Sequence, residues 1–377
     1  MCALYDGEIV GRSKEGNAIT NIPSDIVGNS GHDSAFDGKV CLGDSVELYF
    51  PRDLRASKGS QALALFEGKD WLRYGLGYTA LCNIPLYDGP YCSFGEPYIL
   101  SRAGRNLEIA LRRCDAMRQL CLNIGDSFSI FLSRSKAFIE KQNAYSVKQL
   151  YGRDLFMDDE QYANFRPLPR CVGIFRSASP FDDVYQRRDY VVRCAKQHRI
   201  ASILDLADTE YQLDQLLEDK IEYVSELRAS KNVIAVGDDS GFTSLEFSNA
   251  IVDGLRKLIK LPKPWLIHCR AGKRRSGFVC ALLEGIAGAN LDELIDDYML
   301  SYKFNNGITR ENNPCEYRTI MYDTIIKILD HIRLKPELGG PDDLSIINWH
   351  DQCLGFLLSH GMPLDEALEL ERLVTSE

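Results

Sequence analysis

The chain has 377 residues, of which 45% are hydrophobic, enough for two domains that each bury a core. The net charge of −10 disfavours general binding to nucleic acids or acidic membranes. None of the 12 cysteines forms a C-x-x-C pair and the six histidines are scattered, so no zinc site and no cofactor are predicted. With no signal segment and no run of membrane-spanning length, we expect a cytoplasmic protein with reduced thiols.

Two short sequence matches in the first half share one spacing. Leu4-Tyr5-Asp6-Gly7 recurs as Leu86-Tyr87-Asp88-Gly89, and Gly43-Asp44-Ser45 recurs at the same offset of 82 as Gly125-Asp126-Ser127. Apolar residues alternate with other residues after each Gly-Asp-Ser, as in half-buried strands. We therefore predict a β-rich domain over residues 1–168 with an internal duplication, the repeats spanning 3–85 and 86–168. Two unrelated strands after common Gly-Asp turns are the alternative.

The first half resembles no family that we can identify. It contains no glycine-rich phosphate loop, metal cluster or Ser/His/Asp arrangement, and its aromatic residues are typical of a core. We expect this module to bind a partner or the substrate of the second half. Pro167 and Pro169 interrupt regular structure and place the domain boundary near residues 166–170.

The second half alternates between helical and strand patterns. Val184, Val191 and Ala195 suit one helix face, residues 201–206 and 232–236 are apolar enough for strands, and an apolar stripe runs from Phe247 to Leu258. A further strand is expected at 265–267, and a helical tail over 317–334, 342–360 and 363–375. This alternation predicts a mainly parallel sheet flanked by helices over residues 169–377, with ligands bound at the carboxyl ends of its strands.

The stretch from His268 to Gly277 carries the chemistry. It lies between a predicted strand and a predicted helix, where backbone N–H groups of a tight loop converge on an anion. The same field favours the thiolate form of Cys269, the form that acts as a nucleophile. Arg275 can hold two phosphate oxygens, and Ser276 can donate a hydrogen bond to the sulfur as it leaves. The expected phosphate-binding residues are Arg270, Ala271, Gly272, Lys273, Arg274 and Arg275, with Gly272 permitting the turn.

Cysteine and arginine in this C-x5-R spacing, followed by Ser276 and Gly277, resemble the signature loop of the cysteine-dependent protein tyrosine phosphatases. Three further segments resemble the branch found widely in bacteria and fungi, over about residues 169–375. They are the R-S-x-x-P segment at 173–180, the D-L segment at 202–206 with Glu210, and the D-Y-L-L-S-like segment at 297–301. The resemblance implies an α/β phosphatase domain that hydrolyses phosphomonoesters through a cysteinyl-phosphate intermediate, as a protein tyrosine or dual-specificity phosphatase.

The leaving group of such a reaction needs a proton from a general acid. The family usually supplies an aspartate from a loop roughly thirty residues before the cysteine, which points to Asp239, with Asp238 and Asp208 as alternatives and Asp205 behind them. The related branch often has aspartate immediately before the loop arginine, where this chain has Arg274. That residue cannot be the acid.

The substrate class stays open at this point. Cations at Arg270 and Lys273 resemble phosphoinositide phosphatases and multi-specificity members, since they could pair with extra phosphates on an inositol ring. Phosphoinositide or inositol polyphosphate hydrolysis is therefore the alternative function, although both side chains could instead point to solvent and only stabilise the thiolate. A rhodanese-like sulfurtransferase and an inactive phosphate-binding module are more distant alternatives.

Overall fold

The computed structural model describes residues 5–27, 40–54, 69–75, 77–87, 96–112, 114–217, 222–237, 244–333 and 341–376. The chain divides into two compact units, Met1–Val147 and Lys148–Glu377. The boundary predicted near residues 166–170 is wrong, because Arg166–Pro167 forms a strand of the C-terminal sheet. Among the described residues, no helix is both long and apolar enough to cross a bilayer.

The described part of the N-terminal unit is rich in strands, with a few short helical elements. The strands are β1 (Tyr5–Arg12), β2 (Ala18–Pro23), β3 (Ser45–Phe50), β4 (Leu72–Gly75), β5 (Tyr78–Tyr87), β6 (Pro97–Leu100), β7 (Asn106–Leu111) and β8 (Ser127–Arg134). The helices are α2 (Ala116–Gln119), α3 (Ile139–Ser146) and the short 3-10 turn η1 (Ser24–Ile26).

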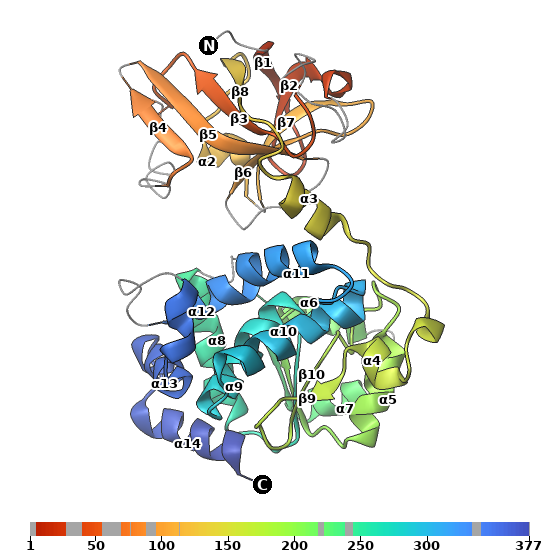
Figure 1. The fold of residues 1–377 in the computed structure, drawn as a ribbon. Coiled ribbons are helices and arrows are strands. Elements are labelled where there is room, and N and C mark those ends of the chain that lie inside the picture. The colour runs from red at the N-terminus through yellow and green to blue at the C-terminus, as the bar shows by residue number, and fades with distance from the viewer. Residues whose placement is uncertain are drawn as a thin grey trace. The chain divides into compact units, whose positions relative to one another are not determined.

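These strands form a barrel-like sheet in the order β3-β8-β1-β2-β7-β6-β5-β4, and a further β3–β5 pairing closes the ring (Figure 1). The pairings are antiparallel except for β5 with β6, which is parallel. Alternate residues of β3 and β8 point into the closed core, which buries Val46, Leu48, Phe50, Phe128 and Ile130. The alternation read from the sequence thus corresponds to the inner face of the barrel.

The two Gly-Asp turns have the same internal hydrogen bonds. In the first, the Asp44 carboxylate accepts the backbone N–H of Cys41 at 2.8 Å. In the second, the Asp126 carboxylate accepts the backbone N–H of Asn123 at 2.7 Å. The side chain in each case satisfies a backbone donor three residues earlier, which stabilises the turn before its strand.

Both turns also bind a neighbouring strand in the same way. Leu86 exchanges two backbone hydrogen bonds with the first turn, at 2.8 and 3.1 Å, and Ile9 exchanges two with the second, at 2.8 and 2.9 Å. The two sequence matches have an offset of 82 residues, but Ile9 and Leu86 are 77 positions apart. The tetrapeptide match therefore does not align the two strand positions that bind the equivalent turns. Leu4, Asp88 and Gly89 of that match lie outside the described residues. The internal duplication therefore remains a prediction, supported by the turns.

The C-terminal unit alternates strands and helices. Its strands are β9 (Arg166–Pro167), β10 (Ile174–Ser177), β11 (Ser202–Asp205), β12 (Val233–Ala235) and β13 (Trp265–His268). Its helices are α4 (Asp159–Ala163), α5 (Arg188–Gln197), α6 (Glu210–Leu216), α7 (Glu222–Ala229), α8 (Leu245–Leu258), α9 (Arg274–Ile286), α10 (Leu291–Asn306), α11 (Pro314–Met321), α12 (Lys327–Ile332), α13 (Trp349–Ser359) and α14 (Leu364–Thr375). Short 3-10 or π turns occupy Arg153–Leu155 (η4), Tyr322–Ile326 (η6) and Pro341–Ile346 (η7).

The sheet of this unit has the order β12-β11-β13-β10-β9. Strands β10 to β13 run parallel, and only β9 is antiparallel to its neighbour. Helices α5 and α7 lie on one side of the sheet, and α8 and α9 lie on the other (Figure 1). His268 at the end of β13 is in register with Ser177 of β10 and Asp205 of β11. The loops that follow these three strands therefore start at one edge of the sheet.

One predicted helix begins later than its apolar pattern suggested. Val184 is 62% exposed and precedes α5, which starts at Arg188. Two aspartate side chains hold the intervening turn: Asp182 accepts the N–H of Val184 at 2.7 Å, and Asp183 accepts the N–H of Arg188 at 3.2 Å. These local hydrogen bonds compete with the helical ones and delay the helix.

We expect Asp44→Ala to lower the free energy of unfolding of the N-terminal unit by about 2–4 kcal/mol. Asp44 is fully buried, and its carboxylate accepts the N–H groups of Cys41 and Lys136, both at 2.8 Å. Removal leaves both donors without this acceptor, whereas Asp44→Asn keeps one oxygen and should lose roughly half as much. Urea unfolding, monitored by hydrogen exchange of residues 5–147, measures this loss of free energy. The exposed Asp25→Ala is the control, and an equal loss in that variant contradicts the prediction.

Candidate active site

The loop from Cys269 to Lys273 joins the end of β13 to the start of α9. Gly272 has a φ of +68°, and a Cβ there would lie 2.4 Å from the carbonyl oxygen of Ser177. It would also lie 2.5 Å from the amide nitrogen of Asn164. Only glycine therefore fits this turn, which packs directly against the neighbouring strand end.

Side chains behind the loop hold its carbonyl groups. The amide nitrogen of Asn164 donates to the carbonyls of Gly272 at 3.0 Å and Ala271 at 3.3 Å. The amide nitrogen of Asn305 also donates to Ala271 at 3.2 Å, and Arg176 donates to Gly272 at 3.0 Å. Because the C=O and N–H of a trans peptide point in opposite directions, the bonds to the Gly272 carbonyl turn the N–H of Lys273 toward the opposite side, whereas the N–H of Gly272 donates to the Cys269 carbonyl at 3.2 Å. A tight loop of this kind at a helix N-terminus is an arrangement that can serve as an anion-binding cradle.

A buried charge cluster supports that arrangement. Arg166 contacts Asp297 at 2.7 Å and donates to the side-chain oxygen of Asn164 at 2.6 Å, while Arg176 pairs with the other oxygen of Asp297. Burial raises the pKa of Asp297, but Arg166 and Arg176 outweigh it and hold that pKa well below its usual range. Burial, followed by the charge of Asp297, raises the pKa of Glu284. Asp297 pairs with both Arg166 and Arg176, so two guanidinium groups share this carboxylate behind the loop.

The thiol lies at the base of the cradle. Cys269 is 7% exposed, and its Sγ is 3.3 Å from the Oγ of the fully buried Ser276 in the first turn of α9. Either atom of this pair can be the donor, so the contact is compatible with the hydrogen bond from Ser276 to the sulfur that the sequence led us to expect.

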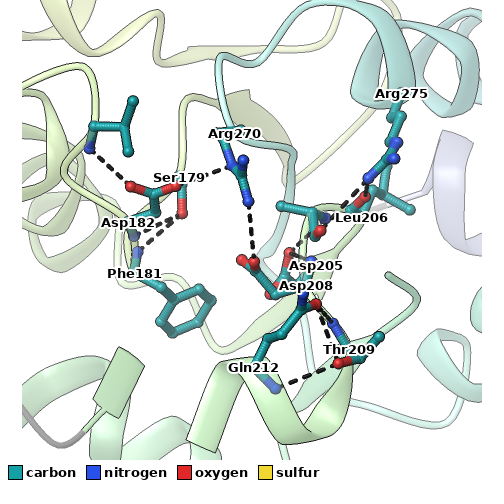
Figure 2. A network of polar contacts seen from close by, with 12 residues as sticks. Ser179, Phe181, Asp182, Asp205, Leu206, Asp208, Thr209, Gln212, Arg270 and Arg275 are labelled. Atoms are coloured by element: carbon teal, nitrogen blue, oxygen red, sulfur yellow. Dashed lines mark hydrogen bonds and ion pairs between the residues drawn. The ribbon is translucent and has the colours of Figure 1, made fainter. Parts of the chain in front are cut away.

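Arg275 reaches from α9 to the loop after β11. Its Nη1 donates to the carbonyl oxygens of Leu206 at 3.0 Å and Ala207 at 3.4 Å. Figure 2 shows Arg275 beside Leu206. These bonds fix the plane of the guanidinium group. A guanidinium held this way is preorganised to present its donors to a tetrahedral oxyanion.

Arg270 lies between two aspartates from different loops (Figure 2). Its Nε is 3.0 Å from Asp182, and its Nη2 is 3.7 Å from Asp208. The side chain of Arg270 is 55% exposed, while those of Asp182 and Asp208 are 10% and 3% exposed. The arginine therefore bridges two buried carboxylates at the mouth of the site.

Lys273 has other partners than Arg270. Its Nζ donates to the side-chain oxygen of Asn306 at 2.9 Å and lies 5.1 Å from the centre of the Tyr302 ring. Burial, followed by the charge of Arg274, lowers the pKa of Lys273 to about 7. Arg274 itself is the first residue of α9. The cations that the sequence grouped in one loop are thus directed to different partners.

Asp208, one of the alternatives for the general acid, lies among the residues that the structure describes. Burial raises its pKa, Arg270 counteracts that effect, and Asp182 adds to it. Its Oδ2 has no hydrogen-bond partner within the described part of the chain. Asp238 and Asp239, the other candidates, lie outside the described residues.

Asp205 has a different place. Its carboxylate is fully buried and accepts the N–H groups of Ala207 at 2.8 Å and Asp208 at 3.3 Å, so it shapes the turn that carries Asp208. His268 lies 3.6 Å from it. Burial lowers the pKa of His268 to about 3, and burial raises the pKa of Asp205 well above its usual range. Both shifts favour the uncharged forms of these groups.

Sequence reasoning missed Asp182, Asn164 and Asn305. Asp182 follows the R-S-x-x-P segment, and the predicted parallel sheet could have placed that loop next to the cysteine loop. No local pattern marks the two asparagines, which contact the loop from far along the chain; Asn164 is 108 residues from Gly272.

We predict that Asn164→Ala lowers kcat/KM about tenfold or more, because the carbonyls of Ala271 and Gly272 lose the donor that orients their peptide groups. Binding of inorganic phosphate should weaken in parallel, as measured by isothermal titration calorimetry. Gln161→Ala, in helix α4, which Asn164 caps at its C-terminus, is the matched control. Wild-type phosphate affinity in Asn164→Ala contradicts a positioning role.

The comparison with known families bears on this site. Residues 240–335 match the model of the tyrosine phosphatase family, a range that includes the cysteine loop, α9 and Asp297. No curated protein matches the chain. The C-terminal unit thus contains a tyrosine phosphatase family domain, whose general activity is that of a phosphatase.

Proposed function

We propose that this protein hydrolyses phosphomonoesters through a cysteinyl-phosphate intermediate, as a protein tyrosine or dual-specificity phosphatase. The observation that carries the proposal is the thiol of Cys269, 3.3 Å from the hydroxyl of Ser276, at the base of a loop whose carbonyls are bound from behind. The guanidinium group of Arg275, which donates to two backbone carbonyls, supports the same mechanism.

In the first step, the Cys269 thiolate attacks phosphorus and the bond from phosphorus to the ester oxygen breaks. The leaving oxygen takes a proton from the general acid, for which we propose Asp208. Loop N–H groups and Arg275 stabilise the charge on the transferring phosphoryl group. In the second step, water attacks the cysteinyl phosphate and gives its proton to the same carboxylate. Phosphate leaves, and Ser276 donates to the departing sulfur.

Asp208 is preferred as the acid because its pKa is raised by burial and because it contacts Arg270 of the loop. A raised pKa favours the protonated form that acid catalysis requires. Asp239 and Asp238 stay the alternatives from the sequence.

Phosphoinositide or inositol polyphosphate hydrolysis is the second candidate. Arg270 favours it, because this cation is exposed at the mouth of the site. Lys273 does not, because its ammonium group donates to Asn306 and lies over Tyr302. The contacts of the two cations together favour a protein substrate. The association of Cys269, Ser276 and Arg275 also argues against a sulfurtransferase or an inactive phosphate-binding module.

For the N-terminal unit we propose a duplicated β module that binds a partner or the substrate of the phosphatase domain, in a cytoplasmic protein. The two equivalent Gly-Asp turns support the duplication. A pull-down with residues 148–377 compared with the full chain, using one phosphorylated substrate, would test the binding role.

Cys269→Ser should reduce turnover of a phosphotyrosine peptide to below about one hundredth of wild type, because a hydroxyl is far less ionised than a thiol. Binding of inorganic phosphate should persist, since the backbone cradle is unchanged. Steady-state kinetics and calorimetry measure the two effects. Cys315→Ser, at an exposed cysteine, is the control. Substantial turnover by Cys269→Ser would rule out the covalent mechanism.

Asp208→Asn should lower kcat about 100-fold for phosphotyrosine and much less for an aryl phosphate with an activated leaving group. In wild type, the rate should fall as pH rises through the raised pKa of Asp208, because only the protonated carboxyl donates. The variant should lose this alkaline limb of the pH profile. Asp214→Asn, an exposed aspartate on α6, is the control. Equal losses on both substrates would transfer the acid role to Asp239 or Asp238.

A further inference from the structure

Hydrogen bonds within its own turn hold the carboxylate of Asp182 in place, independently of its contact with Arg270. The Oγ of Ser179 accepts the N–H groups of Phe181 at 3.1 Å and Asp182 at 3.0 Å. One oxygen of Asp182 accepts the N–H of Val184 at 2.7 Å, and the other contacts Arg270 at 3.0 Å (Figure 2). Each oxygen thus has its own partner, and the turn directs a fixed negative charge at the arginine.

The neighbouring cations of the loop have other roles. Lys273 donates to Asn306, and Arg275 donates to the carbonyls after β11. Of the cations of the cysteine loop whose contacts the structure describes, Arg270, with a side chain 55% exposed, is the one that we expect a second phosphate, next to the one being hydrolysed, to meet. To take the Nε of Arg270, that phosphate would have to displace Asp182, and it would approach Asp208, which contacts the same side chain. Like charges at such separations repel, more strongly where the groups are partly buried.

We propose that Asp182 is a specificity-determining residue: by pairing with Arg270, it makes the site select substrates with a single phosphate, such as phosphotyrosine, over substrates with adjacent phosphates. This inference rests on the proposed function of the same site. Removal of the Asp182 charge frees Arg270 for a second phosphate and broadens the substrate class.

The test compares two ligands that differ by one phosphate, a water-soluble short-chain phosphatidylinositol monophosphate and a bisphosphate with phosphates on adjacent ring carbons. Affinities are measured in the full chain carrying Cys269→Ser, so binding is separated from turnover. Adding Asp182→Asn keeps the hydrogen bond from Val184 and removes the charge. We expect the preference for the bisphosphate to increase about five- to tenfold, the scale of one charge-assisted contact at a partly exposed site.

Two controls separate the role of Asp182 from a general charge effect. Asp183→Asn removes the adjacent charge, whose side chain contacts the N–H of Arg188, and should leave the preference unchanged. Arg270→Ala added to Asp182→Asn should abolish the gain. An unchanged preference in folded Asp182→Asn, or an equal gain in Asp183→Asn, would overturn the inference.

A further test uses a variant that keeps Asp182, so it stays valid even where Asp182→Asn does not fold. Arg270→Ala in a chain that keeps Asp182 should change the preference by less than about twofold, because the arginine is already neutralised. A larger loss of bisphosphate binding would show that Arg270 already binds a second phosphate and would overturn the inference. Failure of the proposed function gives a different result: the wild-type chain hydrolyses neither the phosphotyrosine peptide nor the monophosphate, whatever the binding preference.

Discussion

The chemistry of this site depends on hydrogen bonds that approach the cysteine loop from behind. Asn164, Asn305 and Arg176 bind the carbonyls of Ala271 and Gly272 and so fix two peptide groups of the loop, of which the N–H of Gly272 donates to the Cys269 carbonyl and that of Lys273 faces the opposite side. A tight loop without these partners would be free to rotate its peptides. The conformation of the loop is therefore a product of the surrounding elements as well as of its own sequence.

Buried ionisable side chains surround the cysteine loop. Arg166 and Arg176 both pair with Asp297 behind the loop, and they hold the pKa of that carboxyl well below its usual range. At the strand ends, burial lowers the pKa of His268 and raises that of Asp205, which favours the uncharged form of each. The protein as a whole carries a net charge of −10, so these two arginines are a local group of positive charges.

Parallel register determines which side chains meet at the mouth of the site. Because β10, β11 and β13 end in line, the loops after them bring Asp182, Asp208 and Arg270 together. The two aspartates have different environments: Asp208 is buried with a raised pKa, while Asp182 is fixed by its turn and pairs with the arginine. One carboxyl is thus suited to hold a proton and the other to hold a cation, which is why we propose different roles for them.

The sequence by itself determined that Cys269, Gly272 and Arg275 lie together between a strand and a helix, because they are neighbours along the chain and their spacing is a local property. Helix α8 was also readable, since its apolar stripe reflects local periodicity. Only the tertiary structure decided the domain boundary at residues 147–148, the partners of the loop carbonyls and the contact of Asp182 with Arg270. Those features join segments that are distant in sequence, and they depend on the register of parallel strands and on buried charge, neither of which a local pattern records.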